Sequence, residues 1–99
     1  MNYKISKKAA TELRGLLARK DTANILYEWY REQERDGFDV EPHLMAKRIE
    51  AKIQVLEIEI RLHEEFGIEL HSMSNLIEWL ADYNEMLDSV ARRAALQAA

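Results

Sequence analysis

The sequence predicts an all-α protein, a small antiparallel helical bundle of about four helices built on a long helical hairpin of residues 42–66 and 75–96. Apolar residues recur at steps of three and four along most of the chain, which is the spacing of one face of a helix. Three Gly and one Pro are too few for the closely spaced turns of a β-sandwich or barrel. The 99 residues allow one domain over 1–99, and we expect residues 1–5 and 97–99 to fray.

The first helix is expected to begin after Ser6, whose hydroxyl can cap the free N–H groups of the first turn. Leucines at helical spacing follow it. Asp21 or Thr22 is typical of a new N-cap, so we expect a break at residues 20–22. One continuous helix over residues 7–36 is the alternative.

The second helix is expected from about Thr22 to Asp36. Gly37 can end it in the left-handed conformation, and residues 38–41 form the linker that follows. The predicted inner stripe of this helix comprises Ile25, Leu26, Trp29, Tyr30 and Gln33.

The third helix is expected over residues 42–66, with Pro42 in its first turn and Gly67 as its stop. Its apolar residues form two stripes, whose centres lie about 150° apart on a helical wheel. The first stripe has the heptad spacing of a coiled coil and comprises Ala46, Ile49, Ile53, Leu56, Ile60 and His63. The second stripe comprises Leu44, Ala51, Val55, Ile58 and Leu62. A helix that is apolar on two opposite faces must be covered on two sides.

Residues 56–63 also alternate strictly between apolar and polar, which is typical of a half-buried strand. A strand pair within residues 55–70 is therefore the alternative. We favour a helix because Glu57 and Arg61 form an i,i+4 pair in the favourable order. The segment also lacks the residues of a tight hairpin turn.

The fourth helix is expected over residues 75–96, with Ser72 or Ser74 as its cap. Its apolar stripe repeats the heptad step. Acidic residues line much of its outer face, namely Glu78, Asp82, Glu85 and Asp88.

The second stripe of residues 42–66 raises the question of what covers it. The first two predicted helices are about 21 and 22 Å long, so each covers only part of that stripe. Either both cover it in a monomeric bundle, or a second copy of the chain covers Val55, Ile58 and Leu62. The short helices favour the homodimer, because an exposed apolar strip of this kind would aggregate.

Residues suited to catalysis or metal binding are scarce. The absence of Cys excludes disulfides and thiolate metal sites. His43, His63 and His71 lack the Glu-x-x-His or His-Glu-x-x-His spacing of metal sites. The sequence contains no Gly-x-Ser-x-Gly turn that would present a nucleophilic serine, and no Gly-rich loop that would bind phosphate. We therefore expect no enzyme, no catalytic residue, no cofactor and no metal, and a cytoplasmic protein without a membrane span.

The charge of the chain is unevenly distributed. Residues 1–20 carry six bases and one acid, whereas residues 21–99 carry eight bases and 17 acids. The sequence predicts a non-catalytic protein–protein interaction module, an adaptor or inhibitor that covers a surface on a partner protein. Small helical proteins of this kind are often encoded by a phage or another mobile element, which we take as the expected source. The predicted partner-binding residues are Tyr27, Arg31, Arg35, Glu78, Asp82 and Glu85, because Tyr and Arg concentrate binding energy and the acids form one face.

The alternative function is a nucleic-acid-binding regulator that uses the basic N-terminal helix. Its phosphate contacts would come from Lys7, Lys8, Arg14 and Arg19. The acidic sequence pI of about 5.4 makes this alternative weaker, since nucleic-acid-binding domains are usually basic overall.

Overall fold

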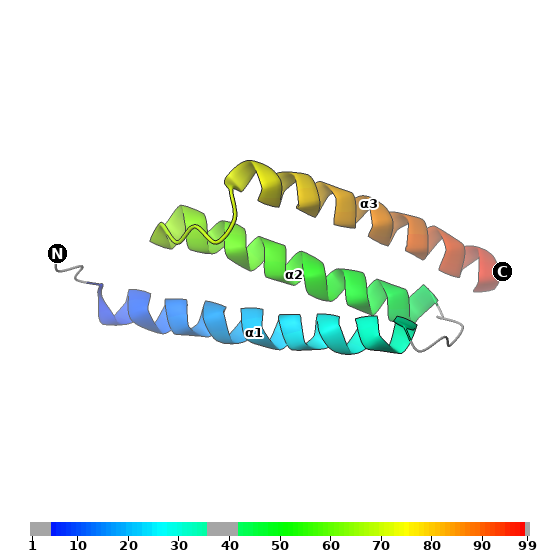
Figure 1. Cartoon of the computed structure of the whole chain (residues 1–99), viewed down its shortest axis with the longest axis horizontal. Helices are drawn as coiled ribbons and strands as arrows, with labels where there is room; N and C mark the ends of the chain where they lie inside the picture. Colours follow the sequence, from blue (N-terminus) through cyan, green and yellow to red (C-terminus); the bar gives the residue numbers. More distant parts are fainter. Residues whose placement is uncertain (1–4, 36–41, 99) are drawn as a thin grey trace.

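The structure, a computed structural model, describes residues 5–35 and 42–98, and these form three α-helices and no strand. Helix α1 spans Lys7–Arg35, α2 spans Pro42–Phe66 and α3 spans Met73–Ala98. The helices lie in a row, with α2 between α1 and α3 and each neighbour antiparallel to the next (Figure 1). Within the described residues, no Cα atom of α1 comes within 8 Å of one in α3. The all-helical prediction is confirmed, and the expectation of about four helices is wrong.

Serine side chains begin two of the helices. The Ser6 hydroxyl accepts a hydrogen bond from the backbone N–H of Ala9 at 3.1 Å. At the start of α3, the Ser72 hydroxyl accepts from the N–H of Asn75 at 3.3 Å. Ser74 already lies inside α3, so of the two predicted candidates, Ser72 is the residue that caps the helix.

Pro42 and Gly67 mark the two ends of α2, at the residues where the sequence predicts them. Gly67 has a φ of 66°, which favours glycine because other residues are strained there. Its N–H donates to the carbonyl of His63 at 3.1 Å, and the N–H of Ile68 donates to the carbonyl of Leu62 at 3.0 Å. These bonds satisfy carbonyls at the end of the helix. The alternative of a strand pair within residues 55–70 is wrong.

Helix α1 continues through residues 20–22 without the predicted break. Thr22 does not cap a new helix, because its hydroxyl donates to the carbonyl of Ala18 at 3.0 Å within the same helix. The 29 residues of α1 span about 43 Å, against about 37 Å for the 25 residues of α2. One continuous helix is therefore long enough to cover a whole flank of α2. Gly37 and the predicted linker 38–41 lie outside the described residues.

Both apolar stripes of α2 are covered by the chain itself. In the first stripe Ile49 and Leu56 are 0% and 1% exposed, and in the second stripe Val55 and Leu62 are 3% and 0% exposed. Ile58 is half-buried and borders the groove between α1 and α2. The homodimer was expected because the second stripe needed a cover, and α1 supplies that cover within one chain.

The polar residues of α2 lie in two seams between the stripes, and these seams differ in exposure. The covered seam comprises Arg48, Lys52 and Glu59, which are half-buried or buried. The open seam comprises Glu50, Gln54, Glu57 and Arg61, which are all exposed. Side chains of α1 and α3 therefore converge over one side of α2 and leave its other side in solvent.

The face of α1 that packs against α2 differs from the predicted one. Leu16 and Ala23 are each 1% exposed and form the buried side of the helix. Ile25, Leu26 and Trp29 are 69%, 42% and 52% exposed. The predicted inner stripe is therefore wrong for these three residues. Its other two members, Tyr30 and Gln33, are half-buried.

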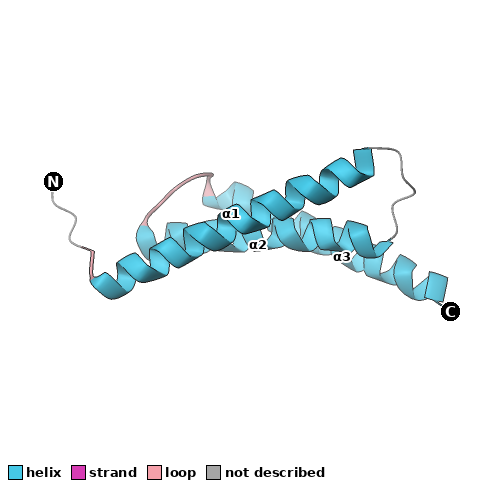
Figure 2. Cartoon of the chain, turned by 90° about the horizontal axis from the view of Figure 1, so that it is seen from below, coloured by secondary structure: helices cyan, strands magenta, loops and turns pink. Residues whose placement is uncertain are grey.

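The row of helices makes an elongated molecule. Its principal extents are 57 × 24 × 21 Å, and its radius of gyration is 16.4 Å, against about 13 Å for a compact domain of this length. Its accessible surface is 7285 Å², against roughly 5,800 Å² for a typical monomer of this mass. Figure 2 views the row with α1 in front of α2 and α3. The outer faces of α1 and α3 thus remain free for contacts with other molecules.

Candidate interaction surfaces

A polar cluster occupies the covered seam next to the α2–α3 loop. Glu59 is the one buried charged residue among those described, with 5% of its surface exposed. Its Oε1 lies 3.0 Å from Nδ1 of His71, and the His71 ring meets the Trp79 ring edge-on at 5.2 Å. A cavity of about 290 Å³ is lined by Lys52, Leu56, Glu59, His71, Trp79 and Tyr83. The pair of Glu59 and His71 ties the loop to α2, and the sequence analysis missed it.

Tyr27 extends this cluster toward α1. Its ring is half-buried and lies 5.2 Å from the Nζ atom of Lys52. Its hydroxyl also interacts with that of Tyr83 on α3, so Tyr27 has neighbours on both of the other helices. Partial burial, and then the neighbouring Tyr27 side chain, raise the pKa of Tyr83 above its usual value near 10. Intramolecular contacts therefore explain Tyr27, whose predicted role in partner binding remains a prediction.

The charged residues near the end of α1 also have partners within the chain. Arg48 Nε lies 2.7 Å from Glu34 Oε2, with the two side chains 14% and 22% exposed. The Arg48 N–H is not directed at that oxygen, so the contact is an ion pair rather than a well-formed hydrogen bond. Arg31 is exposed and lies 3.7 Å from Glu28. The side chain of Arg35 lies outside the described residues.

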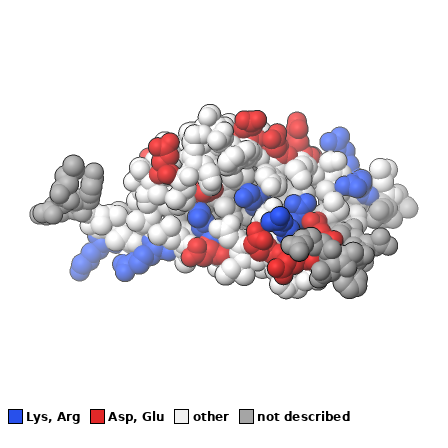
Figure 3. Space-filling model, in the orientation of Figure 1, with Lys and Arg blue, Asp and Glu red and all other residues white. Residues whose placement is uncertain are grey.

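The outer face of α3 is acidic. The four acids predicted to line it, Glu78, Asp82, Glu85 and Asp88, are all exposed and have no ion pair within the described residues. They span about 15 Å of helix. Ile77 and Met86 flank them, with 57% and 40% of their surfaces exposed. Figure 3 shows acidic side chains gathered along the edge of the molecule that α3 forms. We call this set the α3 acidic face.

The outer face of α1 has a different character. We call its residues the α1 outer stripe: Gly15, Ala18, Thr22, Ile25, Leu26 and Trp29. All are exposed, and the Trp29 ring meets the Tyr30 ring edge-on at 5.0 Å. A depression of about 400 Å³ lies at Ile25 and Trp29. A larger groove of about 480 Å³ runs between α1 and α2 beside Ala18 and Thr22. Its large residues, Ile25, Leu26 and Trp29, are those that the sequence pattern predicts to lie in the core.

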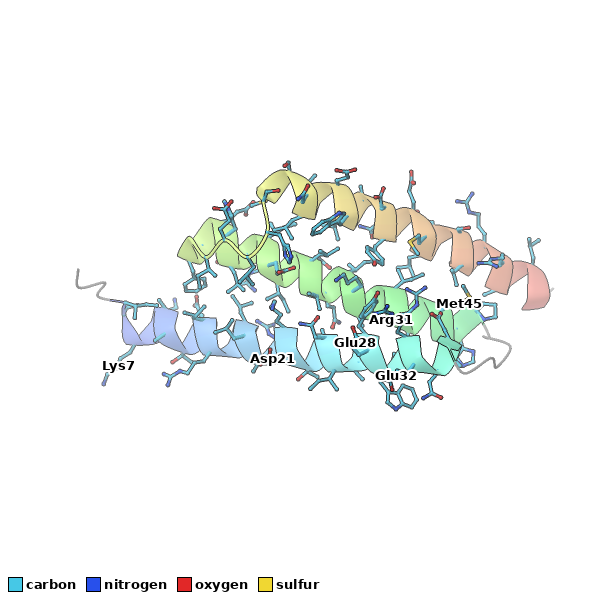
Figure 4. The ribbon with its side chains drawn as sticks, in the orientation of Figure 1. Lys7, Asp21, Glu28, Arg31, Glu32 and Met45 are labelled. Atoms are coloured by element: carbon cyan, nitrogen blue, oxygen red, sulfur yellow. The ribbon has the colours of Figure 1, made fainter. Side chains whose placement is uncertain are left out.

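Basic residues occupy the N-terminal half of the same helix. Lys7, Lys8, Arg14 and Arg19 are exposed and have no ion pair within the described residues. Lys7 projects away from α2, at the free edge of the row (Figure 4). This half of α1 is therefore open to a negatively charged neighbour.

The predicted partner-binding residues do not form one surface. Tyr27 lies over the covered seam, and Arg31 lies one turn along α1. Glu78, Asp82 and Glu85 lie on the outer face of α3, with α2 between the two groups. The acids therefore constitute a candidate site without Tyr27 and Arg31.

Among the described residues there is neither a cluster suited to a metal ion nor a helix suited to a membrane. No group of three or more His, Asp or Glu residues that could hold a metal ion occurs within residues 5–35 and 42–98. In the same ranges, no helix is long and apolar enough to cross a membrane. Comparisons with protein-family models, with curated proteins and with solved structures found no match to this chain.

Proposed function

We propose that the protein is a non-catalytic interaction module, an adaptor or inhibitor, that covers a basic surface on a partner protein with the α3 acidic face. The observation that carries the proposal is this set of four exposed carboxylates, which have no ion pair among residues 5–35 and 42–98 and are flanked by the exposed side chains of Ile77 and Met86. A partner would meet a row of carboxylates with an exposed apolar side chain on either side, so charge would direct the contact and the apolar side chains would add buried area.

The energetics of the α3 acidic face favour binding to a cationic surface. No ion pair within the described chain must break before Glu78, Asp82 or Glu85 contacts a partner. Like charges in a row also attract a basic surface from a distance, which speeds association at low salt. The partner's surface is accordingly expected to be rich in Lys and Arg.

Helix α3 is also well suited to present these residues, because its other side is anchored. Leu76 and Val90 are 1% and 3% exposed, and Ser72 caps the first turn. A face on an already ordered helix loses little conformational entropy on binding, so more of the contact energy appears as affinity.

The test is a capture experiment with the tagged chain and its charge-reversal variants, followed by measurement of affinity for the purified partner. Glu78→Lys, Asp82→Lys and Glu85→Lys in one variant should abolish capture. A control with Glu57→Lys, Glu64→Lys and Glu69→Lys changes the net charge equally at exposed sites outside α3. The control should retain the partner, and binding should weaken with salt. Equal capture by both variants would refute the assignment to α3.

Nucleic-acid binding is a second candidate, favoured by the exposed basic residues Lys7, Lys8, Arg14 and Arg19 on α1. Changing all four to Glu should abolish a mobility shift that also declines with salt. The absence of any shift with the unaltered protein at low salt would exclude this candidate.

A further inference from the structure

We propose that a second copy of this chain docks on the α1 outer stripe, with the two α1 helices antiparallel and related by a two-fold axis near Thr22. This surface lies on the opposite edge of the row from the α3 acidic face, so the proposal is independent of the function proposed above. The assembly would be a homodimer with one acidic face at each end. Val55 and Leu62, two of the α2 residues predicted to form the dimer interface, are buried within the chain and take no part.

The sizes of the residues along the stripe favour antiparallel pairing. Its N-terminal half offers the small residues Gly15 and Ala18, whereas its C-terminal half offers Ile25 and Trp29, which are 69% and 52% exposed. Antiparallel pairing sets the small half of one copy against the large half of the other. Trp29 of the second copy then lies over Gly15, and its Ile25 lies beside Ala18 and the groove between α1 and α2. Thr22 of each copy meets Thr22 of the other.

Gly15 has no explanation within a single chain. It lies in the interior of a helix, where glycine is unfavourable relative to alanine, and its φ is not positive. A Cβ atom at this position would meet nothing within 4 Å. A second copy supplies the reason, because a glycine at this position lets a bulky side chain of that copy approach the α1 backbone closely. Thr22 is also compatible with close approach, since its hydroxyl already bonds to the carbonyl of Ala18.

The charges along α1 favour the same arrangement. Residues 7–20 carry five bases and one acid, whereas residues 21–35 carry four acids and two bases. Arg14 and Glu32 are exposed, have no ion pair within the described residues, and lie 18 residues apart in sequence. Eighteen residues make about five whole turns, so both lie along the same edge of the stripe.

Symmetry then decides which edges meet. An antiparallel two-fold pair brings equal edges together, so Arg14 of each copy comes to Glu32 of the other, twice in the dimer. A parallel pair would bring opposite edges together and would align bases with bases and acids with acids. The charges therefore select one of the two orientations.

The first experiment measures the mass of the purified full chain in solution by light scattering and sedimentation equilibrium over a concentration series. The expected mass is twice 11.6 kDa. Trp29→Ala and Arg14→Glu should each raise the dimer dissociation constant at least about tenfold, because the first removes a large aromatic contact and the second replaces an attraction by a repulsion at both ends of the interface. Combining Arg14→Glu with Glu32→Arg should restore dimerisation, because each interface then contains the reversed pair.

Controls separate dimerisation from folding and from the α3 acidic face. Ile77→Ala removes a side chain of similar exposure on α3 and should leave the dissociation constant unchanged. Circular dichroism should show the same helix content for every variant, since Trp29 and Arg14 are exposed. A monomer at all concentrations, or a dimer indifferent to Trp29→Ala and Arg14→Glu, would overturn the proposal.

Orientation is tested by disulfide trapping, because the chain has no native Cys. Ala18→Cys and Ile25→Cys variants should cross-link to each other when mixed under a thiol–disulfide buffer, since those positions face each other across the antiparallel pair. Efficient cross-linking of the Ala18→Cys variant to itself, with no cross-link between the Ala18→Cys and Ile25→Cys chains in the mixture, would show a parallel pair and overturn the proposal.

Discussion

Truncating Leu62 to Ala tests whether one chain covers both flanks of α2. Leu62 belongs to the stripe on the α1 side and is 0% exposed, so the substitution removes three buried carbons and leaves a cavity. Buried Leu→Ala changes lower the free energy of unfolding by about 2–5 kcal/mol. For a domain of 99 residues, this loss lowers the melting temperature by roughly 8 °C or more. Leu56→Ala, on the α3 side, should have an effect in the same range, because Leu56 is 1% exposed.

The assay is urea and thermal unfolding followed by circular dichroism, at a concentration low enough to hold the chain monomeric. Leu96 is 76% exposed, so Leu96→Ala should change the free energy of unfolding by less than about 0.5 kcal/mol and is the matched control. Leu62→Met keeps the volume and should lower it by less than about 1.5 kcal/mol, which guards against a variant that fails to fold. If Leu62→Ala behaves like the control in the monomer, α1 does not cover this flank, and the reasoning is refuted.

Three further predictions concern local features. Gly67→Ala should lower the free energy of unfolding by about 1 kcal/mol in chemical denaturation, because an alanine is strained at a φ of 66°; no change would show that the helix end relaxes freely. Ser72→Ala should lower the free energy of unfolding by about 0.5–2 kcal/mol through loss of the cap, whereas Ser74→Ala should lower it less. A larger loss for Ser74→Ala would show that Ser72 is not the cap. The raised pKa of Tyr83 means that its contribution to stability is complete below pH 10 and is lost as the pH rises through the folded-state pKa. Tyr27→Phe should lower that pKa in an absorbance titration, since burial of Tyr83 remains but the Tyr27 hydroxyl is gone; an unchanged titration would exclude an interaction between the two hydroxyls.

The ends of the helices follow from local chemistry, and for that reason they were predictable. Ser6, Pro42 and Gly67 act through their own backbone or through groups within four residues of them. The two apolar stripes of α2 were readable for a similar reason, because a helix of 25 residues repeats its pattern often enough to outweigh the competing strand pattern.

The candidate site could be predicted only in part. Glu78, Asp82 and Glu85 lie on one exposed face because the heptad step of α3 places its apolar residues on the other. Glu59 and His71 could not be paired from the sequence, since Glu59 lies on α2 and His71 lies 12 residues later in the α2–α3 loop, whose path decides their distance. Neither residue belongs to a recognisable motif.

The phase and the continuity of α1 depended on the rest of the molecule. Ile25, Leu26 and Trp29 each have more apolar surface to bury than Ala23, so local burial alone favours the face that the structure exposes. One straight helix has a single phase along its whole length, and that phase must suit every contact with α2 at once. The phase of α1 that the structure adopts buries Leu16 in the core and also brings Glu34 to its ion pair with Arg48 of α2. The sequence thus establishes the serine cap that begins α1, both ends of α2 and the two apolar stripes of α2. The packing of three helices decides which stripe is buried, because that choice depends on the fit between whole helices and not on any one residue.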